Sequence, residues 1–253
     1  MAEMKFTSSR SATPPYSHGP PPNGRLGDID GDGLGDVAIA AAYHASSYKG
    51  TVYVQLGSFA GSLELKDADL VITGASASMY LGSGLGRVGD ADGDGLDDIL
   101  VGANGASAGG SASGGVYLLT GGPTGAVTTA SAEATFNGAA GDYLGSQEAM
   151  AGADWDGDGV SDLLLGAGSN DGAATNAGVA YLFLSPLSGT YGVSGAHGRI
   201  YGEAAGDYMG AALVPLGDQD ADGLPELLFG ASSNDGGGTN SGSGWILMSS
   251  RLF

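Results

Sequence analysis

Residues 89–103 read GDADGDGLDDILVGA, and this stretch decides the fold. Five aspartates and four glycines are followed at once by an apolar run, so a charged loop leads into a segment that we expect to be buried. Related loops begin at residues 28, 154 and 218, with spacings of 62, 64 and 64 residues, and read DIDGDGLGD, DWDGDGVSD and DQDADGLPE. A repeat of this length with strand-like content is typical of a propeller or of a solenoid of β units.

Each repeat contains the same series of short β segments. A glycine-broken apolar segment such as YLGSGLGRVG precedes the acidic loop, and the runs ILVGA, GVYLLT and EATFNG show the three segments that follow it. Four short strands joined by turns form one blade of a propeller. We therefore predict an all-β fold, a β-propeller of four four-stranded blades over residues 25–253. The approximate repeats are 25–74, 75–138, 139–202 and 203–253.

The two ends of the repeat array complement each other. AEMKFTS at residues 2–8 lines up with AEATFNG at 132–138, the fourth strand type, and the last repeat stops at its third strand type. We predict that residues 1–24 form an N-terminal strand and a proline-rich leash, which leaves a short inner strand near residues 24–27. The N-terminal strand completes the last blade in cis, or is donated in trans to a neighbouring molecule, which would build head-to-tail filaments.

The acidic loops predict metal centres. Each has carboxylates at positions 1, 3, 5 and 9 and a glycine at position 6, a spacing that turns several oxygens inward, together with the carbonyl of position 7. Six to eight oxygens suit Ca²⁺, whereas zinc needs His or Cys, and the chain has no cysteine. In the second loop, Asp97 is expected to point outward. The predicted ligands of the four calcium sites are Asp28, Asp30, Asp32, Leu34 and Asp36; Asp90, Asp92, Asp94, Leu96 and Asp98; Asp154, Asp156, Asp158, Val160 and Asp162; and Asp218, Asp220, Asp222, Leu224 and Glu226.

GDADGDGLDDILVGA followed by GGVYLLT resembles the FG-GAP repeat of integrin α-subunit propellers and of many bacterial surface proteins. LVGA, LLGA and LFGA match the second half of that motif, and YLGS and YMGA stand in place of the first half. The resemblance covers about residues 25–253. It implies a β-propeller with calcium in the loop between the first two strands of each blade, held by the ligands named above. The calcium is either purely structural or also takes part in binding a ligand.

Charge and composition exclude several function classes. The net charge is −20, with 28 acidic residues against 8 Lys and Arg, which disfavours binding to nucleic acid or to anionic lipid. No run approaches the roughly 18 apolar residues of a membrane span. The three histidines, His18, His44 and His197, lie in different segments and form no catalytic set with other residues. We therefore expect a protein that is not an enzyme, does not bind nucleic acid and does not insert into a membrane.

The function predicted from the sequence is that of a calcium-stabilised module for adhesion or structural assembly. Its expected partners are other protein subunits, including itself head-to-tail. Surface calcium modules bind at roughly 10⁻⁴ to 10⁻³ M, which favours an extracellular or cell-surface location, although MAEMKFTSSR lacks the apolar core of a signal peptide. Two alternatives stay open: a lectin-like propeller that binds carbohydrate or another ligand, and an accessory domain of a larger secreted hydrolase.

Overall fold

The computed structural model describes residues 5–7, 23–57, 62–146 and 149–249. These residues form β-strands and loops, with single 3₁₀ turns at η1 (Ser46–Tyr48), η2 (Leu65–Asp67), η3 (Thr129–Ser131) and η4 (Val193–Gly195). The all-β prediction is confirmed. Within the described part of the chain, no helix is long and apolar enough to cross a membrane.

Four antiparallel sheets follow the four sequence repeats, and we name them sheets I to IV. Sheet I contains β2 (Asn23–Arg25), β3 (Val37–Ala41), β4 (Thr51–Gln55) and β6 (Leu70–Thr73). Sheet II contains β7 (Leu81–Gly89), β8 (Asp98–Ala103), β9 (Gly115–Leu119) and β11 (Ala134–Asn137). Sheet III contains β12 (Met150–Ala153), β13 (Asp162–Ala167), β14 (Val179–Phe183) and β16 (Gly198–Tyr201). Sheet IV contains β17 (Met209–Gly217), β18 (Glu226–Ala231) and β19 (Ser243–Leu247).

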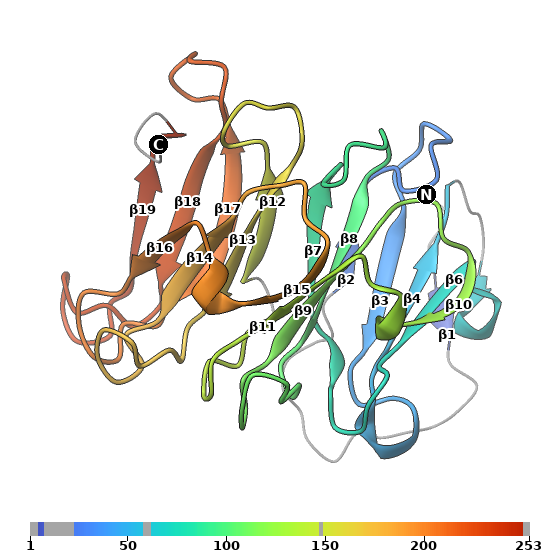
Figure 1. Cartoon of the computed structure of the whole chain (residues 1–253), viewed down its shortest axis with the longest axis horizontal. Helices are drawn as coiled ribbons and strands as arrows, with labels where there is room; N and C mark the ends of the chain where they lie inside the picture. The colour runs from blue at the N-terminus through green and yellow to red at the C-terminus, as the bar shows by residue number, and fades with distance from the viewer. Residues whose placement is uncertain (1–4, 8–22, 58–61, 147–148, 250–253) are drawn as a thin grey trace.

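The inner strand of the first repeat is short, as its prolines predicted. β2 has three residues and pairs with β3 through Gly24 and Ala38, whereas the corresponding strands β7 and β17 each have nine. In Figure 1 the sheets succeed one another across the molecule, from the blue sheet I to the red sheet IV. The inner strands β7, β12 and β17 line one cleft of about 480 Å³, so they converge on a common centre. This arrangement is consistent with a β-propeller.

The sequence did not predict three short strands, of which two join neighbouring sheets and one pairs with the N-terminal strand. They are β5 (Ser62–Glu64), β10 (Gly125–Thr128) and β15 (Gly189–Gly192). β10 pairs in parallel with β6 of sheet I, and β15 pairs in parallel with β11 of sheet II. Gly125 N donates to Asp69 O at 2.7 Å, and Gly189 N donates to Glu133 O at 2.7 Å. From each of sheets II and III, the chain thus returns to the outer edge of the sheet before it.

The N-terminal strand lies beside sheet I. β1 (Lys5–Thr7) pairs in parallel with β5, with Phe6 opposite Leu63, just as β11 pairs with β15. β1 therefore has a fourth-strand position, but it does not complete the last blade of its own chain. The expected pairing in cis was wrong, because β5 offers β1 a parallel edge at one end of the molecule while β19 lies at the other end (Figure 1).

The core lies between the faces of successive sheets. Ala38 and Val52 of sheet I pack against Ile99 and Val101 of sheet II, and corresponding apolar clusters separate sheets II and III and sheets III and IV. Glycine allows the close approach: a Cβ on Gly102 would lie 2.0 Å from the carbonyl oxygen of Gly145, in the segment that leads to β12 of the next sheet. The glycine of LVGA therefore allows neighbouring sheets to lie close together.

Candidate metal centres

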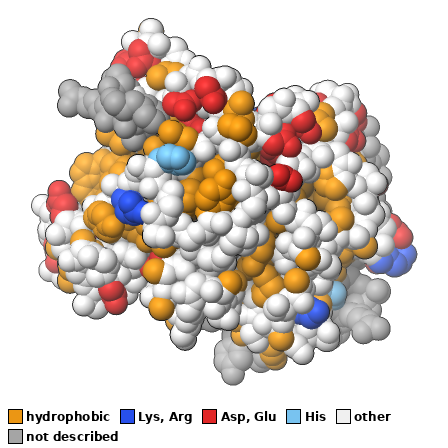
Figure 2. All heavy atoms as spheres, viewed as in Figure 1, with side chains coloured by type: hydrophobic (Ala, Val, Ile, Leu, Met, Phe, Trp, Pro, Cys, Tyr) orange, Lys and Arg blue, Asp and Glu red, His pale blue; other side chains and the backbone are white. Residues whose placement is uncertain are grey.

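Each acidic loop joins the first two strands of its sheet. We number them loop 1 (residues 28–36), loop 2 (90–98), loop 3 (154–162) and loop 4 (218–226). All four lie at the same end of the sheets in Figure 1, and acidic side chains gather along that upper edge in Figure 2. The repeat in the sequence thus becomes a row of acidic loops on one edge of the molecule.

The aspartate at position 1 shapes each loop. In loop 2, Asp90 Oδ1 accepts hydrogen bonds from Gly93 N at 2.6 Å and Asp94 N at 3.1 Å, and Oδ2 accepts from Gly95 N at 2.8 Å. Loops 1 and 3 repeat all three bonds, and loop 4 repeats two of them. Gly95 has φ +90°, a conformation that glycine adopts without the cost of a Cβ. The turn is therefore specified by residues within the loop.

The carboxylate at position 9 is buried and ties the loop to the end of the third strand. Asp98 Oδ2 accepts from Ala91 N at 2.8 Å, and its Oδ1 accepts from Gly121 N at 2.7 Å. Asp36 and Asp162 make the corresponding pairs of bonds. Glu226 accepts from Gln219 N and from Ser249 Oγ. Side chains at this position have no exposed area, so they act as fixed anchors of the loop.

Burial also changes the acidity of these anchors. Loss of solvent raises the pKa of Asp98 to about 7 and that of Asp162 to about 6, although backbone N–H donors oppose the rise. The pKa of Asp36 is raised for the same reason. A nearby cation would favour the charged form of each carboxylate and counter this effect.

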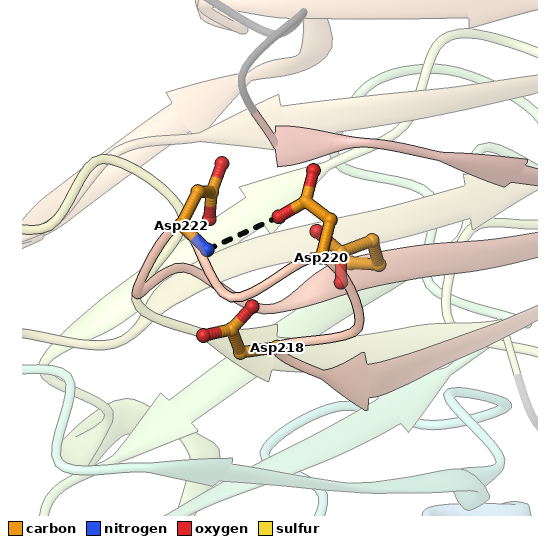
Figure 3. Close-up of side chains that lie close together, drawn as sticks. Asp218, Asp220 and Asp222 are labelled. Atoms are coloured by element: carbon orange, nitrogen blue, oxygen red, sulfur yellow. Dashed lines mark hydrogen bonds between the residues drawn. The ribbon is translucent and has the colours of Figure 1, made fainter.

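Most of the predicted carboxylate ligands come together. In loop 4, one oxygen from each of Asp218, Asp220, Asp222 and Glu226 lies within 4.8 Å of the others, and Figure 3 shows the three aspartates projecting from the turns of the loop. The corresponding clusters are Asp28, Asp30 and Asp32 in loop 1, Asp90, Asp92 and Asp94 in loop 2, and Asp154, Asp156 and Asp162 in loop 3. The predicted ligands Asp36, Asp98 and Asp158 lie outside these tight groups.

Position 7, whose carbonyl was predicted as a ligand, is held in place by position 5. Leu34 N donates to Asp32 Oδ1 at 2.7 Å, and Leu96 N donates to Asp94 Oδ1 at 2.8 Å. Val160 and Leu224 are bonded in the same way to Asp158 and Asp222. Positions 5 and 7 are thereby fixed relative to each other in every loop.

The donor set fits a hard divalent cation. The ion pairs among the described residues are Lys66–Asp67 and Arg87–Asp97, so no Lys or Arg neutralises the clustered acids at positions 1, 3, 5 and 9. Several carboxylates at this separation repel one another unless a cation or a proton intervenes. Carboxylate and carbonyl oxygens in a glycine-containing loop are the ligands that Ca²⁺ accepts in proteins.

Loops 1 and 2, and loops 2 and 3, contact each other through position 8. Asp97 Oδ2 accepts from Asp28 N at 2.8 Å, and Asp97 N donates to Asp28 O at 3.0 Å. Ser161 N donates to Asp90 O at 2.7 Å in the next pair of loops. Asp97 lies outside the acidic cluster of its own loop, in agreement with the expectation that it points outward, and its side chain, which is 22% exposed, reaches the neighbouring loop.

The histidines that the structure describes lie outside the loops. His44 and His197 are exposed; His44 Nδ1 lies 3.2 Å from Tyr53 Oη, and His197 Nδ1 accepts from Leu184 N at 3.0 Å. His18 falls outside the described residues. Asp142 is buried and accepts from Ala139 N at 2.8 Å and from Asn170 Nδ2 at 2.8 Å, so it stabilises a turn.

Comparison with known proteins agrees with this geometry. The FG-GAP repeat family matches residues 23–54, which contain loop 1. Integrin alpha-PS3 of Drosophila melanogaster is 39% identical over 88 residues, or 33% of this chain and 8% of that protein. Integrin alpha-PS5 of Drosophila melanogaster is 33% identical over 147 residues, or 55% and 14%. Integrin alpha-IIb of Homo sapiens is 37% identical over 82 residues, or 32% and 8%.

The aligned segments thus span between 8% and 14% of the length of these relatives. The FG-GAP match covers loop 1 and strands β2 and β3 of sheet I and most of β4. Residues 23–54 thus match the FG-GAP repeat family, and the chain is similar to integrin α-subunits over part of its length.

Proposed function

We propose that this chain is a calcium-stabilised, non-enzymatic β-propeller module that serves adhesion or structural assembly outside the cell. One observation carries the proposal: each of four consecutive loops brings at least three acidic side chains within 4.8 Å of one another. Similarity to integrin α-subunits supports a role in adhesion. Expected partners are other protein subunits, further copies of this chain among them.

In this proposal, calcium stabilises the folded structure of each loop. An ion held by positions 1, 3, 5, 7 and 9 would join the exposed turn to the buried anchor, and the anchor already bonds to the end of the third strand. Because hydrogen bonds join loop 2 to loops 1 and 3, calcium bound at one of these sites would also stabilise the neighbouring loop. Metal binding and folding are then coupled.

A calcium titration tests the proposal. Isothermal calorimetry on the whole chain should show binding to the four loops with half-saturation between about 10⁻⁴ and 10⁻³ M, the range of extracellular calcium modules. The variants Asp94→Asn and Asp222→Asn should each weaken one site. The matched control is Asp67→Asn, which removes an exposed carboxylate outside the loops. No calcium binding at these concentrations would refute the proposal, and micromolar binding would contradict its extracellular part.

A second candidate function is binding of glycans. Tyr48, Tyr143 and Tyr201 are 45%, 48% and 44% exposed, and the ring of Tyr48 lies 6.1 Å from that of Tyr80. Exposed aromatic rings with a polar tip suit the apolar faces of sugars. A glycan array probed with the calcium-loaded chain and with Tyr48→Ala tests this alternative. Binding that Tyr48→Ala abolishes would favour it, and an array without signal would reject it.

A further inference from the structure

In the part of the chain that the structure describes, sheets I and IV each leave one face incompletely covered, and the two faces are opposite ones. Every residue of β8, β9, β13 and β14 in the middle sheets is buried. In β3 the half-buried positions include Val37 and Ile39, which align with Ile99 and Val101, the residues of β8 that pack on the preceding sheet. In β18 the half-buried Leu228 aligns with Leu100, which packs on the following sheet.

The two incompletely covered faces are apolar. On sheet IV, Ile246 is 59% and Val214 is 44% exposed, beside Leu228. On sheet I, Val37, Ile39 and Tyr53 line one hollow. Within the chain, three pairs of successive sheets pack face to face, as Leu182 of sheet III and Phe229 of sheet IV show. The exposed faces of sheets IV and I correspond to the two faces that meet in each of these contacts. The face of sheet IV could therefore pack on the face of sheet I in the way that successive sheets pack inside the chain.

A glycine in sheet IV provides independent support. A Cβ on Gly102 would lie 2.0 Å from Gly145 O, in the segment that leads to the next sheet, and a Cβ on Gly166 would lie 2.0 Å from Gly210 O in β17. Gly230 has the same place in its repeat, yet the nearest atom to its added Cβ is Ala212 Cβ at 3.7 Å. Sheet IV thus carries the glycine that admits a following sheet, and the described residues leave that space open.

The strand edges also complement each other. β11 pairs with β9 through one edge and with β15 through the other, whereas in the described part of the chain β1 pairs only with β5 and β19 only with β18. Phe6 stands opposite Leu63 as Phe136 stands opposite Tyr191. Transferring the β11–β9 register to β1 and β19 places Phe6 opposite Gly244 and Thr7 opposite Ser243.

We propose that sheet IV of one copy packs against sheet I of a second copy, whose β1 pairs with β19, and that two copies close one ring. The inference rests on the proposed assembly function, and it identifies a second copy of this chain as the partner. Gly35 N of the second copy would donate to Asp218 O, as Asp97 N donates to Asp28 O inside the chain.

The ring is favoured over an open filament by the arrangement of the inner strands. β7, β12 and β17 line a single cleft, so successive sheets turn about one axis. A head-to-tail contact that continues such a rotation forms a ring if the rotation closes. Two copies supply about eight sheets, within the range of four to eight blades that is typical of propellers.

Solution mass with a surface variant tests the contact. Light scattering in saturating calcium should give twice the chain mass of 24.7 kDa, and Ile246→Asp should reduce the mass to one chain. The control Tyr143→Asp alters a residue that is 48% exposed and has φ 50°, which aspartate tolerates, and it should keep the doubled mass. A monomeric unaltered chain, an open polymer, or a dimer that survives Ile246→Asp would overturn the proposal.

A disulfide tests the strand register. The chain has no cysteine, and opposed positions in antiparallel strands have Cα separations suited to a disulfide. Mixing the single variants Thr7→Cys and Ser243→Cys under oxidation should give a covalent heterodimer on a denaturing gel. Mixing Thr7→Cys with Thr190→Cys, an exposed position on β15, should not. Absence of the first cross-link, or equal yields from both mixtures, would overturn the register.

The outcome is separable from that of the proposed function. A monomeric chain that calcium stabilises would reject only the ring. A dimer that binds no calcium would reject only the calcium-stabilised module. The Ile246→Asp variant should keep calcium binding in the range of the unaltered chain, since the loops and the sheet face are separate.

Discussion

Asp97 Oδ2 accepts a 2.8 Å hydrogen bond from the backbone nitrogen of Asp28, which lies 69 residues earlier in the chain. The bond joins loop 2 to loop 1, and a second bond runs from Asp97 N to Asp28 O. Two acidic loops are therefore held side by side by one bond to a side chain and one between backbones, although the charges of their side chains alone would separate them.

Replacing Asp97 should weaken the contact between loops 1 and 2 without removing a calcium site. Asp97→Ala leaves Asp28 N without its acceptor and should lower the free energy of unfolding by about 1–3 kcal/mol. Asp97→Asn keeps one acceptor oxygen and should cost less. Urea unfolding measures both, and calorimetry should still count the same calcium sites. If the Asn variant lost a calcium site, Asp97 would be a ligand and the account of loop 2 would be wrong.

Two other carboxylates of loop 2 should have different effects. Asp98→Asn puts an amide NH₂ beside backbone donors at Ala91 or Gly121, so it should destabilise even the calcium-free chain, by about 2–4 kcal/mol. Asp94 is exposed, so Asp94→Asn should weaken calcium binding and change the calcium-free stability by less than about 1 kcal/mol. Urea unfolding with chelator, alongside calorimetry, checks both. Equal calcium-free stabilities would contradict the anchor role of Asp98.

A glycine variant tests the contact between sheets. Gly102→Ala would put a Cβ 2.0 Å from Gly145 O, a backbone atom, and should cost about 1–3 kcal/mol or more. Gly195→Ala is the control, because a Cβ there meets nothing within 4 Å. Thermal unfolding compares the two variants. A Gly102→Ala chain that melts with the control would mean that the sheets are not so close.

The repeats, the loops and the order of strands could be predicted from the sequence because their signals are local. Asp-Gly turns and apolar runs recur every 62 to 64 residues, and even the short β2 followed from its prolines. The position 1 turn is likewise made by residues within five positions of Asp90.

The missed features depend on contacts between distant residues. β10 is mostly exposed, with no buried side to give it an alternating pattern, and its partner β6 belongs to another repeat. Asp97 looked like any acidic residue in a loop because its partner is 69 residues away. The pairing of β1 was mispredicted because the sequence shows what type of strand it is, and not which of two edges it meets.

Stability of the calcium-free chain should depend on pH in an unusual direction. Burial raises the pKa of Asp98 to about 7 and of Asp162 to about 6, against about 4 in an unfolded chain. Between these values the folded state binds more protons, so the free energy of unfolding should fall as pH rises from about 4 to 7. Saturating calcium should remove or reverse the trend, since it favours the charged carboxylates. Urea unfolding in chelator across this range measures the slope, and a stability that rises with pH would contradict the burial of these anchors.

Calcium-dependent thermal unfolding tests the central claim most directly. The unfolding midpoint of the whole chain would be recorded in chelator, in excess calcium and in magnesium at equal ionic strength. An ion bound to the folded state alone stabilises it by about 2.7 kcal/mol per site at a hundred times its dissociation constant. The account predicts a midpoint several degrees or more higher in calcium than in chelator, with a smaller rise in magnesium. The same midpoint in calcium and in chelator would contradict it.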